Sequence, residues 1–144
     1  MRWASYQEAV LFQERVVRAT GGSVGVLDQG KLEAAIARPL TLVFDYEPFP
    51  TPALKVAALI ESIITTHPFN DGNKRTAMRL GLALLEFNFP QIAIPTDDDI
   101  ETIAVGVNNG EITISQVAQW LEGLYACADP TPVEFDPSDL RPYP

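Results

Sequence analysis

Cysteine and histidine are almost absent from this sequence. Its 144 residues include one cysteine, Cys127, and one histidine, His67. A single cysteine cannot form a disulfide within the chain, and it excludes a cysteine-rich metal site. His67 lies far from Cys127 in the sequence, and no Cys/His signature surrounds either residue. We therefore interpret Cys127 as a packing residue rather than a nucleophile.

Positive charge is also scarce. The chain has 10 lysine and arginine residues against 19 aspartate and glutamate residues, a net charge of −9. Direct nucleic-acid binding requires a basic face, so this balance argues against it. Lys74, Arg75 and Arg79 form a local exception. Such a cluster is usually a solvated helix face, and the alternative is a local site for an anion.

Long apolar runs are missing as well. No run approaches the roughly 18–20 residues that a membrane span needs. The N-terminal segment contains Glu8 and Glu14 within its apolar pattern and lacks the apolar region of a signal peptide. We therefore expect a cytoplasmic protein without a membrane anchor. With 47% hydrophobic residues, the chain is long enough for one globular domain with its own core.

The N-terminal third of the sequence predicts two helices. Apolar residues spaced three and four apart indicate an amphipathic helix over residues 4–19, which the glycines at 21–22 end. Asp28 is a suitable N-cap for a short helix over residues 29–38, which stops before Pro39.

Two strongly apolar segments indicate the centre of the fold. Residues 41–50 combine β-branched and aromatic residues with prolines, which predicts an extended loop or a small hairpin. Thr51 and Pro52 then form a helix start, with a cap and a proline at the first helical position. Residues 53–65 and 76–87 are apolar on almost every side, so we expect two buried central helices joined as an antiparallel pair.

The C-terminal third predicts two further helices and a tail. An acidic first turn over residues 96–99 begins a helix that runs to about Asn108. A capping-box pattern at 113–116 begins the last helix. Residues 129–144 are rich in proline and acidic residues and cannot bury enough apolar surface to fold alone. The prediction is an all-α domain of about six helices over residues 1–128, followed by this tail.

The polar stretch HPFNDGNKR, residues 67–75, connects the two central helices. His67 is suited to accept a proton near neutral pH, and Asp71 is suited to bind Mg²⁺. The first turn of a helix favours anions, so Lys74 and Arg75 are misplaced there unless an anion lies between them. That misplacement favours a bound phosphate.

An ordinary loop explains part of the same pattern. Asp71 or Asn73 would serve as a simple N-cap, and a lone histidine such as His67 is usually a satisfied core residue. Phe69 is expected to plug the loop into the core in either case. The stretch is not a P-loop, because the first glycine of GxxxxGK[ST] is absent and no strand precedes it. The spacing by itself leaves both interpretations open.

The stretch resembles the signature of the Fic/Doc family, HPFx[DE]GNGRxxR. It matches through Arg75, except that Lys74 replaces the second glycine, and Met78 replaces the later arginine. Both departures are features of the Doc branch, the death-on-curing toxins, whose form is roughly HxFx[DN][AG]NKR. Residues 21–39 and 95–122 also resemble the segments that flank the motif in Doc-like proteins.

The resemblance implies a compact all-α fold that presents the motif as its active-site loop. It also implies transfer of a phosphate-containing group from a nucleotide to a protein hydroxyl. His67 would be the base, Asp71 would bind Mg²⁺ and Phe69 would anchor the loop. Four further residues would hold the phosphates of the nucleotide: Gly72, Asn73, Lys74 and Arg75. Arg79 lies near the position of the missing family arginine, and only that proximity assigns it to the phosphate site.

Lys74 sets the expected reaction. A glycine here leaves room for the α-phosphate and AMP is transferred, whereas the lysine of Doc-like proteins implies transfer of the ATP γ-phosphate. The family's target would be a threonine of a translation elongation factor, and its phosphorylation would arrest translation. The alternatives are a Fic-like AMP transferase and a catalytically idle scaffold that binds a partner.

The resemblance also implies a restraint on the toxin. The internal inhibitory pattern [ST]xxxE[GN] of some Fic proteins is absent, because Ala118 lies four residues before Glu122. A separate Phd-like antitoxin is therefore expected. Such antitoxins dock a helical segment in a groove, so an exposed apolar groove is expected near the motif.

Overall fold

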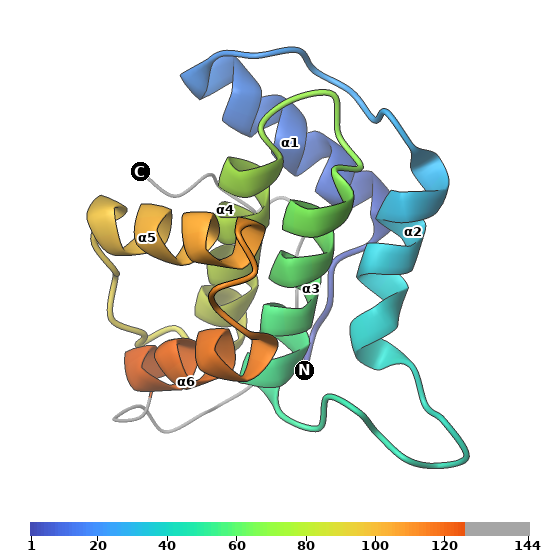
Figure 1. The fold of residues 1–144 in the computed structure, drawn as a ribbon, viewed down its shortest axis with the longest axis vertical. Coiled ribbons are helices and arrows are strands. Elements are labelled where there is room, and N and C mark those ends of the chain that lie inside the picture. Colours follow the sequence, from blue (N-terminus) through green and yellow to red (C-terminus); the bar gives the residue numbers. More distant parts are fainter. Residues whose placement is uncertain (126–144) are drawn as a thin grey trace.

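The computed structural model describes residues 1–125, and these residues form an all-helical fold (Figure 1). The predicted tail, the domain boundary at residue 128 and Cys127 lie outside the described residues. Within the described part there are six α-helices and no strand, as the sequence predicted. The elements are α1 (Tyr6–Thr20), α2 (Gln29–Ala37), a 3₁₀ turn (Arg38–Leu40), α3 (Pro52–Thr66), α4 (Asn73–Asn88), α5 (Asp97–Asn108) and α6 (Ile114–Tyr125).

Most of the predicted helix starts are confirmed by their caps. The side chains of Asp28, Thr51 and Thr96 each accept a hydrogen bond from the backbone of the helix that follows. Thr113 and Gln116 form the predicted capping box, with bonds of 2.9 and 3.2 Å. These short-range signals fixed the helix boundaries to within about two residues, which is the usual uncertainty of such boundaries.

The second helix stops before Pro39, as predicted, one residue earlier than expected. Regular α-helix stops at Ala37, and the chain tightens into the 3₁₀ turn that contains Pro39. Proline fits within the first positions of a helical turn, where its missing N–H is not needed. Pro39 therefore changes the helix type without ending the helical path.

The α3–α4 pair forms the centre of the molecule, as predicted. The two helices run antiparallel side by side; in Figure 1, α1 crosses their upper end, α2 lies to the right, α5 to the left and α6 below. The residues of α3 from Val56 to Ile60 are all 0% exposed. The absence of a side chain at Gly81 of α4 allows this close approach, because a Cβ there would lie 2.7 Å from Cδ1 of Ile60.

A small hairpin lies at the start of α3, at the opposite end from the α3–α4 connection (Figure 1). Val43 and Tyr46 pair through two backbone hydrogen bonds of 2.8 Å each. Phe44 and Asp45 between them have positive φ values of 49° and 65°, as in the tight turns of two-residue hairpins. The predicted loop or hairpin over residues 41–50 is therefore a hairpin, and its Phe44 side chain is fully exposed.

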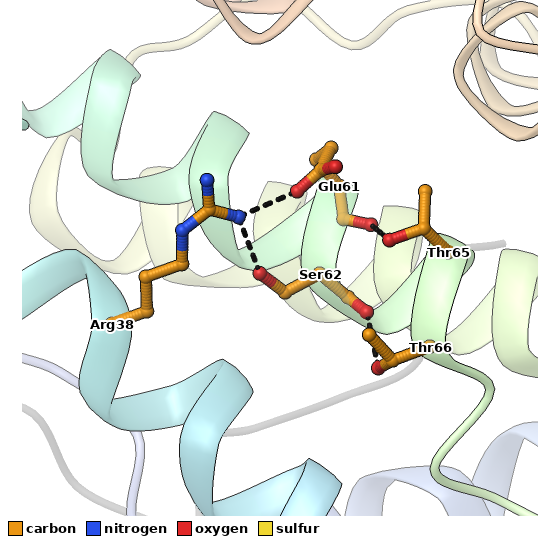
Figure 2. A network of polar contacts seen from close by, with 5 residues as sticks. All are labelled: Arg38, Glu61, Ser62, Thr65 and Thr66. Carbon is orange, nitrogen blue, oxygen red and sulfur yellow. Dashed lines mark hydrogen bonds and ion pairs between the residues drawn. The ribbon is translucent and has the colours of Figure 1, made fainter.

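Polar contacts attach the residues on either side of this hairpin to α3, and Figure 2 shows those of Arg38. Arg38 donates to Glu61 at 2.6 Å and to Ser62 at 2.9 Å. Its guanidinium also lies over the ring of Phe49, 5.4 Å from the ring centre. Lys55 contacts the side chain of Glu47. The segment before α3 is therefore attached to the helix even though its tip is solvated.

The N-terminal residues are attached to the far end of α4. The side chain of Asn88 accepts a hydrogen bond from the N–H of Arg2 at 2.8 Å and donates to its carbonyl at 3.0 Å. Trp3 donates from its ring nitrogen to the carbonyl of Ile36 at 2.9 Å. None of the helices in residues 1–125 is long and apolar enough to cross a membrane.

Candidate active site

His67 ends helix α3 in a left-handed conformation. Its φ and ψ are 51° and 59°, and its N–H donates to the carbonyl of Ile63 at 3.2 Å. Pro68 disfavours the right-handed helical region for the residue before it. Histidine is among the residues that tolerate the left-handed region. The side chain of His67 is exposed, so the interpretation as a buried core histidine is wrong.

Phe69 and Asn73 close the connecting loop on itself. The Phe69 side chain is only 1% exposed. The amide of Asn73 accepts a hydrogen bond from the N–H of Phe69 at 2.9 Å and donates to its carbonyl at 3.1 Å. The Asn73 side chain is thus used within the loop, whereas its backbone N–H belongs to the first turn of α4.

Gly72, not Asp71 or Asn73, is the N-cap of α4. Gly72 has φ 69° and provides no side chain to cap the helix, so the expectation of an N-cap at Asp71 or Asn73 is wrong. A Cβ at Gly72 would lie 2.9 Å from Cγ1 of Val17 in α1, which leaves little space for another residue. The first hydrogen bond of α4 runs from the N–H of Thr76 to the carbonyl of Gly72. The earlier N–H groups of this first turn have no intrahelical partner and suit an anion.

The segment before α2 runs alongside this loop. Leu27 and Asp28 both donate backbone hydrogen bonds to the carbonyl of Pro68, at 2.8 and 3.0 Å. The N–H of Asn70 donates to the carbonyl of Gly25 at 2.9 Å. Two segments about 45 residues apart in sequence therefore hold each other in place, so the loop between α3 and α4 is braced along its length.

Asp71 is exposed, and one of its two carboxylate oxygens is hydrogen-bonded to the protein. Its Oδ2 accepts a hydrogen bond from the N–H of Ser23 at 2.7 Å. Mg²⁺ in nucleotide sites is usually bound by one or two carboxylates, completed by waters and substrate phosphates. Residues 1–125 contain no group of three or more His, Cys, Asp or Glu side chains placed to hold a metal. Asp71 therefore fits a metal that arrives with a nucleotide, and not a cage made by the protein alone.

The two cations at the start of α4 have different surroundings. Arg75 donates to the carbonyls of Thr20 at 3.1 Å and Gly21 at 3.2 Å, and also contacts the Thr20 hydroxyl. It thus caps the C-terminus of α1, where a positive charge is favourable. The argument that both cations require an anion is therefore wrong for Arg75. Lys74 is exposed and has no polar side-chain partner within the described residues.

A groove of about 410 Å³ lies between the first half of α4 and α5. Cations from α4 and carboxylates from α5 line it together with apolar residues: Lys74, Arg75, Arg79, Asp97, Glu101, Met78, Ile100, Ala104 and Val105. The expected groove beside the motif is therefore present, with a lining that combines apolar and charged side chains. Arg79, assigned only by proximity from the sequence, shares this groove with Lys74.

Comparisons with known proteins find one matching family and two named relatives. The family profile described as "Fic/DOC family" matches residues 3–85. A protein of Mycolicibacterium smegmatis named "Toxin Doc" is 36% identical over 111 residues, covering 76% of this chain and 85% of the relative. A protein of Escherichia phage P1 named "Protein kinase doc" is 34% identical over 130 residues, covering 90% of this chain and 100% of the relative.

Proposed function

This chain belongs to the Fic/DOC family, and from that premise we propose that it is a Doc-like toxin that phosphorylates a protein. The donor is ATP, and the acceptor is a threonine of a translation elongation factor, so the reaction arrests translation in the cytoplasm. The phage P1 relative carries the name "Protein kinase doc", which supports phosphoryl transfer. The elongation factor rests on the Doc resemblance.

The environment of Lys74 is the main support for phosphoryl transfer rather than AMP transfer. Lys74 is exposed, lies in the first turn of α4 and has no polar side-chain partner in the part of the chain described here. A cation there is unfavourable unless an anion is bound. It also occupies the place of the glycine that leaves space for an α-phosphate in AMP transferases. Both properties favour binding of the terminal phosphates of ATP, with the γ-phosphate next to the acceptor.

His67 is the proposed general base. It removes the proton from the threonine hydroxyl while the oxygen forms a bond to the γ-phosphorus. The bond from that phosphorus to the β,γ-bridging oxygen breaks, and ADP leaves with its electron pair. Phosphoryl transfer depends mainly on positioning and charge stabilisation, and a well-placed base contributes about 10²–10⁴-fold. The exposure of the His67 side chain makes it accessible to a protein substrate.

The remaining predicted site residues bind the nucleotide in this proposal. The backbone N–H groups of Gly72 and Asn73 and the ammonium of Lys74 contact the phosphates. Asp71 holds Mg²⁺, which supplies neutralisation of phosphate charge when it is bound. Arg75 adds positive charge at the edge of the groove while its guanidinium holds the C-terminus of α1.

A Phd-like antitoxin segment is the proposed occupant of the α4–α5 groove. An amphipathic helix would place its apolar face on Ile100 and Val105, the apolar lining residues with exposed surface. Lys74 and Arg75 line the same groove. An antitoxin segment in the groove would therefore exclude the phosphates of ATP, which gives direct inhibition.

Labelled ATP tests the reaction. Incubation of the protein with γ-labelled ATP and a bacterial extract should label a single band at the size of the elongation factor. The His67→Ala variant should label nothing while retaining the helical circular dichroism of the parent. Label from α-labelled ATP instead would show AMP transfer. Growth arrest that persists with a folded His67→Ala protein would show a non-catalytic scaffold.

A further inference from the structure

Gln13 is a polar residue in the middle of the buried face of α1. Gln13 is 0% exposed, as are or nearly are its apolar neighbours on that face, Ala9, Val16 and Val17, which belong to the core. A buried carboxamide is unfavourable unless its donors and acceptor are paired. Gln13 pairs them with the backbone of the two loops beside the candidate active site.

Three hydrogen bonds connect Gln13 to these loops. Its Nε2 donates to the carbonyl of Ser23 at 3.2 Å and to the carbonyl of Asp71 at 3.1 Å. Its Oε1 accepts from the N–H of Gly25 at 3.1 Å. Two carbonyls on one side and an N–H on the other permit only this orientation of the amide. Gln13 therefore joins the backbone of Asp71 to the segment from Gly22 to Gly25.

The same segment holds the side chain of Asp71. The N–H of Ser23 donates to Oδ2 at 2.7 Å. Gly22, with φ 117°, passes so close that a Cβ there would lie 3.0 Å from Cβ of Asp71. Oδ2 is thus occupied, whereas Oδ1 accepts no hydrogen bond from residues 1–125. The carboxylate has one oxygen held by the protein and one oxygen available to a ligand.

We propose that Gln13 is a positioning residue for Asp71, and that the segment from Gly22 to Gly25 is the clamp through which it acts. The clamp orients the carboxylate so that Oδ1 is presented to Mg²⁺ before the metal–nucleotide complex arrives. This inference rests on the proposed function, because it assigns a role in metal-dependent nucleotide binding. Groups that orient a metal ligand typically change metal affinity by about 10–100-fold when they are removed.

Asn88 offers a matched control for a purely structural effect. Like Gln13, it is a buried carboxamide, 1% exposed, with three hydrogen bonds to backbone groups. Its partners are the N–H and carbonyl of Arg2 and the carbonyl of Leu84, at the opposite end of α4 from the loop. Loss of either amide should lower stability, but only Gln13 reaches Asp71.

Mn²⁺ binding, followed by electron paramagnetic resonance, tests the proposal with a probe of the same charge as Mg²⁺. The variants are Gln13→Met and Asn88→Leu, which replace each amide by an apolar side chain of similar size. With ATP present, Gln13→Met should bind Mn²⁺ about 10–100-fold more weakly than the parent. Its affinity for ATP in EDTA should be unchanged, and Asn88→Leu should match the parent in both measurements.

The outcomes separate this inference from the proposed function. A parent protein that binds no Mn²⁺ with ATP would remove the metal-dependent function, and the inference with it. A parent that binds Mn²⁺, together with an unchanged affinity in Gln13→Met, would overturn the positioning role alone. Equal weakening in Gln13→Met and Asn88→Leu would also overturn it, because the effect would then be general destabilisation.

A second pair of variants keeps the test decisive if Gln13→Met does not fold. Gly22→Ala places a methyl group 3.0 Å from Asp71, whereas Gly110→Ala also places a side chain at a positive φ, 74°, but with no atom within 4 Å. Gly22→Ala should weaken Mn²⁺ binding with ATP, and Gly110→Ala should not. Equal Mn²⁺ affinities in these two variants would contradict the clamp.

Discussion

Arg75 and Thr20 join the first turn of α4 to the last turn of α1. The guanidinium donates to the Thr20 carbonyl at 3.1 Å and also contacts its hydroxyl. An arginine that is unfavourable at the start of its own helix is therefore favourable at the end of another. This contact distinguishes the two neighbouring cations of the motif. Arg75 has a structural partner, and Lys74 has none within residues 1–125.

Replacement of Arg75 by methionine should lower the free energy of unfolding by about 1 kcal/mol. The guanidinium is partly exposed, so the loss should fall below the roughly 1.5–3 kcal/mol typical of hydrogen bonds to charged groups. Urea denaturation of Arg75→Met and of Arg75→Lys provides the measurement. An Arg75→Met protein with the stability of the parent would show that the contact with Thr20 contributes nothing to folding.

Replacement of Lys74 by alanine should lower phosphoryl transfer and leave stability almost unchanged. Lys74 is exposed and has no side-chain hydrogen bond or ion pair in the described residues, so its removal should change stability by less than about 0.5 kcal/mol. Transfer from γ-labelled ATP should fall at least about tenfold, since a charged contact with phosphate is worth about 1.5–3 kcal/mol. Initial rates of labelling at saturating protein substrate measure this. Undiminished transfer in Lys74→Ala would remove the basis for assigning the reaction class to this residue.

Removal of the divalent metal should abolish transfer without unfolding the protein. The described residues contain no cluster of three potential metal ligands, and the proposed metal arrives with the nucleotide, so we expect the fold of the free protein not to depend on it. Excess EDTA should leave the melting temperature within about 1 °C of its original value, because no binding energy is withdrawn from the folded state. Differential scanning calorimetry with and without EDTA tests this. A large drop in melting temperature would reveal a structural metal site.

Two phenylalanines should respond very differently to truncation. Phe69→Ala removes a ring that is 1% exposed and should cost about 3–5 kcal/mol. Phe44→Ala removes a ring that is 101% exposed at the hairpin tip and should change stability by less than about 0.5 kcal/mol. Chemical denaturation of both variants gives the comparison. A strongly destabilised Phe44→Ala protein would mean that the hairpin tip packs against other residues in solution.

Gly81→Ala should destabilise the protein although alanine favours helices. The added methyl group would lie 2.7 Å from Cδ1 of Ile60, and overpacking of this kind costs about 1–3 kcal/mol. Ile60→Val removes that Cδ1, so the double variant should be more stable than the sum of the single effects predicts. A double-mutant cycle measures the coupling. Strict additivity would show that α3 and α4 can separate at this point without cost.

The sequence by itself determined the helices and the place of the polar loop between two buried ones. Caps such as Asp28 and Thr51 depend on neighbours three residues away, and the apolar periodicity of α3 depends on the helix repeat. Both signals are local and can be read along the chain. The long motif from His67 to Arg75 identified the family for the same reason.

Only the tertiary structure decided what several residues of that motif contact. The bond from Arg75 to Thr20 spans 55 positions, and the bond from Gln13 to Asp71 spans 58. No spacing rule reports contacts at that separation. A glutamine within the apolar stripe of α1 was the one available signal, since a buried amide requires a partner. Burial leaves the amide of Gln13 no water to bond, so its hydrogen bonds depend on the backbone groups that the tertiary structure brings to it.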